Sequence, residues 1–187
     1  MLLSLPLHLA TTDDITSLFN GRIDASVLRL DRIDHRISGN KLFKLKYYLQ
    51  HANQSNKKGI ISFGGAWSNH LLAVAAACRQ SGLASIGIVR GEEPRERSST
   101  LIDAKQLGMH LIYISRGDYR DKKVPSIDAI DEYLVVPEGG YGVEGARGAA
   151  EIADLAPGRF THYCCAIGTG TTMAGLVNAV HDDDQVI

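Results

Sequence analysis

The chain alternates between short apolar runs and amphipathic segments, and this alternation restricts its fold more than any other feature of the sequence. The segment "SNHLLAVAAACRQSG" (68–82) predicts a helix that begins at Ser68 or Asn69 and stops at Gly82. Three of the apolar runs have the composition of short strands: "GIISFGG" (59–65), "ASIGIVRG" (84–91) and "HLIYIS" (110–115). Strands separated by helices of about ten to fifteen residues form βαβ units. We therefore expect an α/β fold, with parallel sheets covered by helices on both faces.

The second half of the chain continues this pattern after a polar stretch at 116–131. A strand is predicted at "YLVV" (133–136) and a helix at "VEGARGAAEIADL" (143–155). The run "THYCCAI" (161–167) is expected to be a strand buried on both faces, because such strands are continuously apolar. The final "QVI" (185–187) predicts the start of another strand.

The composition narrows the classes of function. The 187 residues suffice for one domain or two small ones, and 44% of them are hydrophobic. The formal net charge of -1 argues against a generic role in binding nucleic acid or membrane surfaces, which usually requires a basic excess. The sequence has no uninterrupted apolar run long enough to span a membrane. It also has no Cys/His spacing typical of a zinc site, so we expect no metal.

The N-terminus and the cysteines bear on localisation. The start, "MLLSLPLHLATTDD" (1–14), is apolar but has no basic region, which predicts a buried N-terminal arm rather than a signal peptide. The odd number of cysteines, with two of them adjacent, does not suit a disulfide framework and favours a reducing cytoplasm. We interpret Cys78, Cys164 and Cys165 as small buried hydrophobic residues.

Three lysines crowd the beginning of one predicted helix. The segment "SGNKLFKLKYYL" (38–49) places Lys41, Lys44 and Lys46 directly after a Gly-Asn turn. A helix N-terminus carries partial positive charge and disfavours cations. Either the lysines are solvated, or an anion lies beside them. Lys41 and Lys44 are three residues apart and share a face of the helix, so one could pair with a phosphate while the other acts as an amine nucleophile.

Two loops follow predicted strands at the edge where ligands bind in open parallel sheets. The first, "GTGTT" (168–172), combines glycines, which let a ligand approach the backbone, with hydroxyls that can donate to a phosphate. Plain helix capping would also explain it, and it matches neither a Walker loop nor GxGxxG. The second loop, "GGAWSNH" (64–70), has two glycines, an exposed Trp67 and a Ser-Asn pair, which is more than capping requires. Together with the lysines, the loops indicate a site for a phosphate-bearing ligand.

Four motifs in order resemble one family of enzymes, the 1-aminocyclopropane-1-carboxylate deaminases and D-cysteine desulfhydrases. The motifs are "SGNKLFKLKYYL", "SFGGAWSNHLLAVAAACRQSGL", "VPEGGYGVEGARGAAEIA" and "CCAIGTGTTMAGL". The resemblance implies a pyridoxal-phosphate enzyme with the tryptophan synthase β-like fold (fold type II) and two lobes. We expect residues 47–136 to form the small lobe, and residues 1–46 plus 137–187 to form part of the large lobe. Related enzymes continue well past the Gly-Thr loop, so the C-terminal part of the large lobe is expected to be missing from this chain.

The resemblance also assigns roles to individual residues. It implies that Lys41 forms the imine with pyridoxal phosphate and that Lys44 contacts the cofactor phosphate. It places Asn69 at the ring hydroxyl of the cofactor, and Ser68 at the substrate carboxylate with His70 adjacent. The loop implied to wrap the phosphate comprises Gly168, Thr169, Gly170, Thr171 and Thr172.

The substrate is expected to be a small amino acid. β-Elimination from D-cysteine, giving pyruvate, ammonia and sulfide, requires fewer specialised groups than ring-opening deamination of 1-aminocyclopropane-1-carboxylate, and the residues do not decide between them. Two alternatives stay open: an inactive fragment that binds pyridoxal phosphate or a partner, and a phosphate- or nucleotide-binding domain that uses only "GTGTT". By resemblance we also expect a homo-oligomer.

Overall fold

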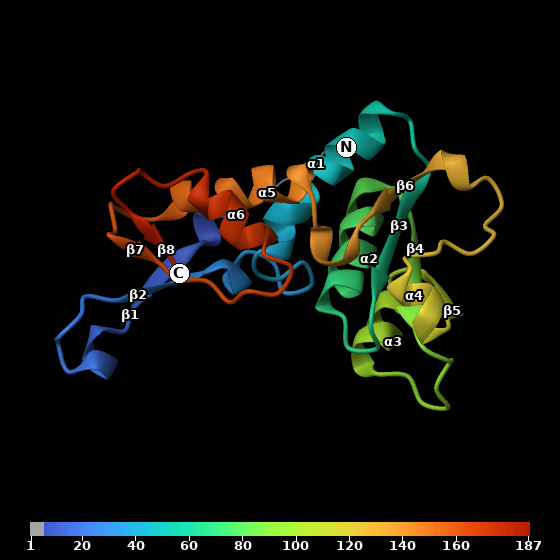
Figure 1. Cartoon of the computed structure of the whole chain (residues 1–187), viewed down its shortest axis with the longest axis horizontal. Helices are drawn as coiled ribbons and strands as arrows, with labels where there is room; N and C mark the ends of the chain where they lie inside the picture. Colours follow the sequence, from blue (N-terminus) through green and yellow to red (C-terminus); the bar gives the residue numbers. More distant parts are fainter. Residues whose placement is uncertain (1–5) are drawn as a thin grey trace.

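A computed structural model of the chain describes residues 6–187, and it consists of two groups of elements joined by one long helix (Figure 1). The first group is built on a four-stranded parallel sheet with strand order β5-β4-β3-β6. Its strands are β3 (Gly59–Gly64), β4 (Ala84–Arg90), β5 (His110–Ile114) and β6 (Tyr133–Val136). Its helices are α2 (Asn69–Ser81), α3 (Ser99–Gln106) and α4 (Arg116–Arg120). The prediction of a parallel α/β sheet is confirmed.

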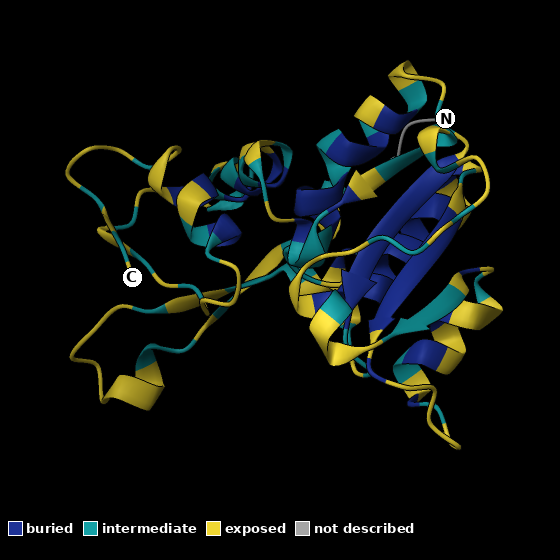
Figure 2. Ribbon diagram, turned by 45° about the vertical axis from the view of Figure 1, so that its right-hand side comes forward, coloured by how far each residue is buried: buried dark blue, intermediate teal, exposed yellow. Residues whose placement is uncertain are grey.

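The central strands are buried because both faces of the sheet are covered (Figure 2). All six residues of β3 are buried, and so are the five inner residues of β4. Helix α2 packs on one face, where Ile60 and Val89 join the main hydrophobic core. On the other face, Phe63 contacts Tyr119 of α4 edge to face, with the ring centroids 6.0 Å apart. The short α4 and the chain that follows it therefore cover the face that α2 leaves open.

Helix ends follow the capping signals of the sequence. The Ser68 hydroxyl accepts a hydrogen bond from the Leu71 amide at the start of α2, and Ser98 does the same for Leu101 at the start of α3. Gly82 ends α2 in the left-handed conformation, with φ of 71°. Ser68 rather than Asn69 is thus the cap, and Asn69 is the first helical residue.

The long helix α1 (Lys41–Gln54) connects the sheet to the second group, which contains α5 (Val143–Ala150) and α6 (Thr171–Val177). Helices α1 and α5 approach closely because α5 presents glycine at the contact. A Cβ atom at Gly148 would overlap the carbonyl oxygen of Phe43 in α1. This close contact fixes α5, and α6 packed against it, relative to the start of α1, where the lysines lie.

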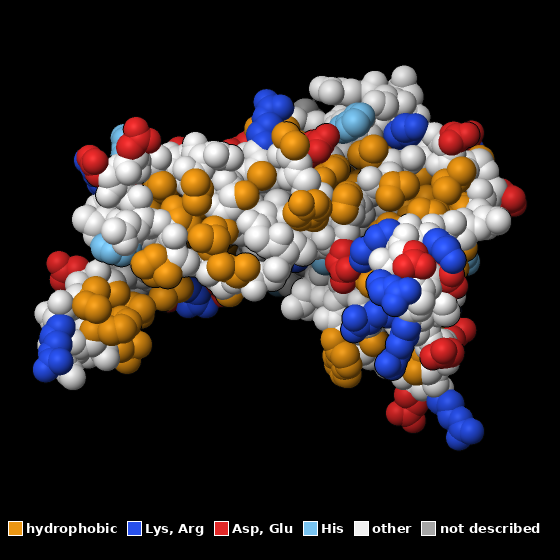
Figure 3. Space-filling view, in the orientation of Figure 1, with side chains coloured by type: hydrophobic (Ala, Val, Ile, Leu, Met, Phe, Trp, Pro, Cys, Tyr) orange, Lys and Arg blue, Asp and Glu red, His pale blue; other side chains and the backbone are white. Residues whose placement is uncertain are grey.

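Two pairs of short strands complete the second group. Strands β1 (Thr11–Asp14) and β2 (Ser26–Arg29) pair antiparallel, and β7 (His162–Tyr163) and β8 (Gln185–Val186) pair parallel. Exposed hydrophobic side chains, including Val143, Ile167 and Val177, gather on the surface of this group (Figure 3). The remaining short elements are 3₁₀ turns: η1 (Leu7–Leu9), η2 (Thr16–Phe19), η3 (Leu30–Arg32), η4 (Ile130–Glu132), η5 (Glu138–Gly140) and η6 (Ala153–Leu155).

The structure corrects two predictions about the second half of the chain. The run 161–167 is not a buried strand: only His162 and Tyr163 are extended in a ladder, and Ile167 is 63% exposed. A strand is buried when strands flank it on both sides and layers cover both faces, whereas β7 pairs with β8 alone within residues 6–187. For the same reason Cys164 is exposed, so only Cys78 fits the prediction of a fully buried cysteine.

The predicted burial of the N-terminal arm is also wrong for the part that the structure describes. Residues 1–5 of the arm lie outside the described residues. Leu7 and Ala10 pack partly against the core, but Thr11, Thr12 and Asp14 are exposed. The pairing of β1 with β2 alone leaves these side chains in solvent. The division into lobes at residues 46/47 and 136/137 stays a prediction.

Candidate active site

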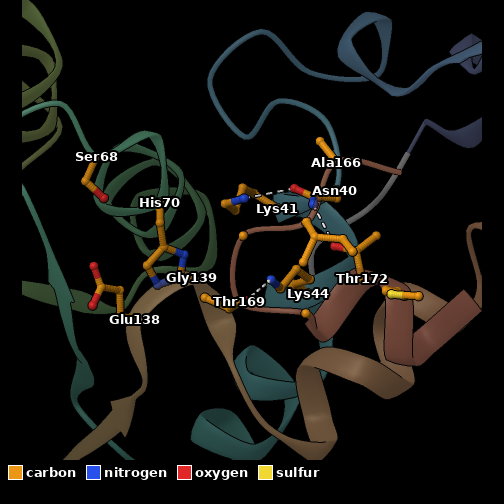
Figure 4. Close-up of a pocket in the computed structure, with 14 residues that line it drawn as sticks. Asn40, Lys41, Lys44, Ser68, His70, Glu138, Gly139, Ala166, Thr169 and Thr172 are labelled. Carbon is orange, nitrogen blue, oxygen red and sulfur yellow. Dashed lines mark hydrogen bonds between the residues drawn. The ribbon is translucent and has the colours of Figure 1, made fainter. Parts of the chain in front are cut away.

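One pocket lies where the start of α1, the start of α2, η5 and the loop before α6 meet (Figure 4). Its volume is about 410 Å³, which is in the range of small-molecule sites. It brings together eight of the residues predicted from the sequence: Lys41, Lys44, Ser68, His70, Gly168, Thr169, Gly170 and Thr172. Segments far apart in the sequence therefore converge on one cavity.

Lys44 is a buried cation at this pocket. Lys44 is only 3% exposed, and its Nζ donates to the Thr169 hydroxyl over 3.2 Å. Within residues 6–187 no carboxylate forms an ion pair with it. Burial, and secondarily the charge of Lys41, lower the pKa of Lys44 from 10.5 to about 8. An ammonium group in this position is incompletely compensated, and a bound anion would compensate it.

Lys41 is half-buried at the first position of α1. Its Nζ donates to Oδ1 of Asn40 over 2.9 Å, and the amide nitrogen of Asn40 donates to the Thr172 hydroxyl over 2.7 Å. Burial lowers the pKa of Lys41, which increases the fraction of neutral, nucleophilic amine. Asn40 therefore orients the amine of Lys41 and links it to the Gly-Thr loop.

The Gly-Thr loop forms one wall of the pocket. A Cβ atom at Gly168 or Gly170 would meet no atom within 4 Å, so these glycines leave open space instead of serving close packing. Gly170 also has a positive φ of 74°. Thr169 faces Lys44, whereas Thr171 is buried behind the wall, with its hydroxyl 2.9 Å from that of Thr169. Four of the five predicted loop residues thus line the pocket, and Thr171 supports them from behind.

The start of α2 contributes two of its three predicted residues. Ser68 lines the pocket and caps the helix, and His70 lines the pocket from its buried position. Asn69 is exposed and does not line the pocket. Its role at a cofactor ring stays a prediction. Trp67 is exposed as expected, at 73%.

His70 is held by hydrogen bonds that run from α2 to β3 and on to the adjacent strand β6. Its Nε2 lies 2.9 Å from the Ser62 hydroxyl, which donates to the carbonyl oxygen of Val136 over 2.8 Å. Its Nδ1 is buried without a hydrogen-bond partner among the described residues. Burial, and to a lesser extent the charges of Lys41 and Lys44, lower the pKa of His70 to about 3, so the ring is neutral.

Lys46, the third lysine of the cluster, lies outside the pocket. Its Nζ pairs with Glu151 of the segment after α5, at 2.6 Å. The crowding of lysines at the start of α1 therefore has two causes: two of them face the pocket, and the third forms an ion pair on another side of the helix.

Sequence reasoning did not single out Asn40, Ser62 or Glu138. Asn40 was visible as the residue before Lys41, at the position of a helix cap, although it makes no capping bond here. Glu138 lies at the edge of the pocket and pairs with Lys122 over 2.6 Å. Ser62 lies within an apolar strand, and its contact with His70 depends on packing that no local pattern reveals.

The match to a protein family decides the chain's membership. The family model described as "Pyridoxal-phosphate dependent enzyme" matches residues 25–187. The chain belongs to this family. The match covers every pocket-lining residue described above, and it does not favour the alternative of a nucleotide-binding domain unrelated to pyridoxal phosphate.

Several relatives carry names that agree with the resemblance in the sequence. A putative 1-aminocyclopropane-1-carboxylate deaminase of Thermotoga maritima is 31% identical over 153 residues, which are 74% of this chain and 48% of that protein. The mitochondrial bifunctional D-cysteine desulfhydrase/1-aminocyclopropane-1-carboxylate deaminase of Arabidopsis thaliana is 28% identical, over 80% of this chain and 43% of that protein. The chain spans about half the length of the curated relatives it matches.

Solved structures show the same fold. The crystal structure of a 1-aminocyclopropane-1-carboxylate deaminase homologue superposes with a TM-score of 0.72 at 24% identity, covering 91% of this chain and 55% of that one. Diaminopropionate ammonia lyase from Escherichia coli superposes with a TM-score of 0.68 at 17% identity, covering 94% and 54%. The fold prediction is confirmed: these are fold type II enzymes, and the chain corresponds to about half of each.

The pocket residues fit pyridoxal phosphate. Its phosphate requires cationic and hydroxyl donors, which Lys44 and Thr169 supply beside the open space at Gly168. Its aldehyde requires an amine with a lowered pKa, which Lys41 supplies.

Among residues 6–187, no helix is both long and apolar enough to cross a membrane.

Proposed function

We propose that this chain carries the cofactor-binding part of a pyridoxal-phosphate-dependent lyase or deaminase that acts on a small amino acid. The observation that carries the proposal is the buried Lys44 ammonium, which has no acidic partner among the described residues and lies beside Thr169 in the pocket that Lys41 also lines. A phosphate-bearing aldehyde would satisfy both amines at once. A phosphate-binding site alone would not require the second one.

The chain's own residues have distinct tasks in this proposal. Bound pyridoxal phosphate supplies an aldehyde that takes up amines and a ring that accepts electrons from the substrate Cα. Lys41, oriented by Asn40, would hold the aldehyde, and its free amine could take up the Cα proton as a general base. Lys44 and Thr169 would anchor the phosphate, and Ser68, which lines the same pocket, would donate to a substrate carboxylate.

The substrate is proposed from the relatives and from the simplicity of the chemistry. The bifunctional Arabidopsis thaliana protein is named for both D-cysteine desulfhydration and 1-aminocyclopropane-1-carboxylate deamination. β-Elimination from D-cysteine, which gives pyruvate, ammonia and sulfide, begins with loss of a Cα proton, for which Lys41 is a suitable base. The cyclopropane substrate has no such proton and must open differently, so we favour D-cysteine or a related amino acid.

Assembly and location complete the proposal. Exposed apolar side chains such as Val143 and Val177 favour association with another chain, and a homodimer is the form that we propose. A reducing cytoplasm agrees with the free cysteines of the described residues.

Reductive labelling tests the proposal. The protein incubated with pyridoxal phosphate should develop visible absorbance, and borohydride followed by peptide mass spectrometry should place the label on Lys41. Lys41→Ala should abolish the absorbance, whereas Lys44→Ala should weaken cofactor retention and Lys46→Ala should leave it unchanged. A label on another residue, or none in folded protein, would contradict the proposal. A labelled protein without activity on D-cysteine would support the inactive fragment.

A further inference from the structure

A second cavity lies where the segment before α1 meets α2 and α3. Its volume is about 490 Å³, larger than that of the candidate active site, and the two cavities share no lining residue. Helix α2 contributes Leu72 and Arg79, which lie seven residues apart and therefore on one face of the helix. The other lining residues are His35, Arg36, Asp103, Gln106 and Leu107. A cavity of this size accommodates a small organic molecule.

The segment before α1 is anchored on both sides of Arg36. The Asp34 carboxylate accepts hydrogen bonds from the backbone amides of Arg36 and Ile37, over 2.7 and 2.8 Å. It also accepts one from Gln80 of α2, over 3.4 Å. Ile37 itself is buried in the main core. Because these donors occupy the carboxylate of Asp34, the turn holds Arg36 at the cavity without neutralising its guanidinium group.

The charged groups of this cavity do not neutralise one another. Within residues 6–187, Arg36, Arg79 and Asp103 form no ion pair. All three residues are exposed, so a ligand can reach their side chains. Two guanidinium groups, one carboxylate and the apolar side chains of Leu72 and Leu107 therefore line one cavity with their charges unpaired.

The combination of groups indicates the chemistry of an occupant. Guanidinium groups bind carboxylates through paired hydrogen bonds. The Asp103 carboxylate would repel a plain anion, whereas it would attract an ammonium group. The apolar side chains favour a ligand that buries hydrocarbon against them. A small molecule that carries a carboxylate, an ammonium group and an apolar part satisfies all of these groups at once.

We propose that this cavity is a second binding site, which takes a small apolar amino acid. Arg36 and Arg79 bind the carboxylate of the amino acid. Asp103 binds its ammonium group, and its side chain lies against Leu72 and Leu107. The site is separate from the pocket in which the proposed function places cofactor and substrate, and it does not depend on that function.

NMR of the arginine side chains tests the site in the full chain without added cofactor. L-Leucine carries all three groups, 4-methylpentanoate is leucine without the amino group, and phosphate is an anion without an apolar part. L-Leucine should shift the Nε resonances of Arg36 and Arg79, and should bind about threefold more tightly than 4-methylpentanoate because it adds an exposed ion pair. Arginine resonances that L-leucine leaves unshifted, or phosphate that binds as tightly as L-leucine, would overturn the proposal.

A matched pair of substitutions tests the cations. Arg79→Gln, followed at Arg36, should weaken the binding of L-leucine and of 4-methylpentanoate by about fivefold, because both present a carboxylate. Arg95→Gln makes the same change of charge at an exposed arginine outside the cavity, and it should leave both affinities unchanged. Equal losses in the two variants would reduce the effect to net charge and refute the assignment.

Asp103→Asn tests the ammonium group. In this variant L-leucine should bind only as tightly as 4-methylpentanoate, whose own affinity should not fall. A preference for L-leucine that survives the substitution would contradict the proposal. The resonances of Arg36 and Arg79 report this cavity, so leucine that enters the candidate active site is not counted. Failure to bind pyridoxal phosphate would refute the proposed function and leave these results intact.

Discussion

Replacing Lys44 with methionine isolates the cost of burying an ammonium group in this site. Methionine has a similar length and no charge, so it retains most of the packing while it removes the cation. Lys46→Met is the matched control, because Lys46 lies on the same helix and outside the pocket, paired with Glu151. We expect Lys44→Met to stabilise the cofactor-free protein at neutral pH and to weaken its binding of pyridoxal phosphate.

The magnitude follows from the pKa of Lys44. A fall from 10.5 to about 8 corresponds to a cost of about 3 kcal/mol for the charged form in the folded protein. Because the folded pKa is the lower one, the unfolded chain binds more protons between pH 8 and 10.5, and wild-type stability gains from this residue as the pH rises through that window. Below pH 8 the full cost is present. The lost hydrogen bond to Thr169 reduces the net gain of the variant.

Urea denaturation of the three cofactor-free proteins at pH 7 and pH 10 measures these effects. The advantage of Lys44→Met over wild type should be largest at pH 7, up to about 3 kcal/mol, and should shrink at pH 10. Adding pyridoxal phosphate should stabilise the wild type and Lys46→Met more than Lys44→Met, since a ligand stabilises the state that binds it. The same pH dependence in the wild type and in Lys44→Met would refute the reasoning, because the buried charge would then have no measurable cost.

Three further predictions concern other parts of the site and the fold. Because the pKa of His70 is lowered to about 3 in the folded protein, the free energy of unfolding of the wild type should fall as the pH drops from 6.5 toward 3. In urea denaturation at pH 7 and pH 4.5, His70→Asn should lose less of its free energy of unfolding between the two pH values than the wild type does. Gly148→Ala should lower the free energy of unfolding by about 1–3 kcal/mol, because its Cβ would overlap α1, whereas Gly158→Ala, with open space around it, should not. Thr169→Val should weaken cofactor binding in a titration followed by absorbance, by about tenfold, and an unchanged affinity would remove Thr169 from the phosphate site.

The sequence by itself determined the parallel sheet, the capped helices and the principal residues of the pocket. Strand and helix periodicity depend on neighbours along the chain, and the capping roles of Ser68 and Gly82 are equally local. Lys41 and the Gly-Thr loop were found because each lies in a short local motif: Lys41 follows a Gly-Asn turn, and the loop alternates glycine with threonine. Local signals of this kind survive in any tertiary context that buries the apolar faces.

Only the tertiary structure decided which lysine is buried and what His70 contacts. Lys44 and Lys46 are two residues apart, yet Lys44 meets Thr169, 125 residues away in sequence, and Lys46 meets Glu151. The contact of His70 with Ser62 depends on the packing of α2 against β3, which no periodicity reports. Burial and hydrogen bonding are properties of contacts between distant segments, so the charge cost at Lys44 and the burial of the His70 ring arise only when those segments pack together.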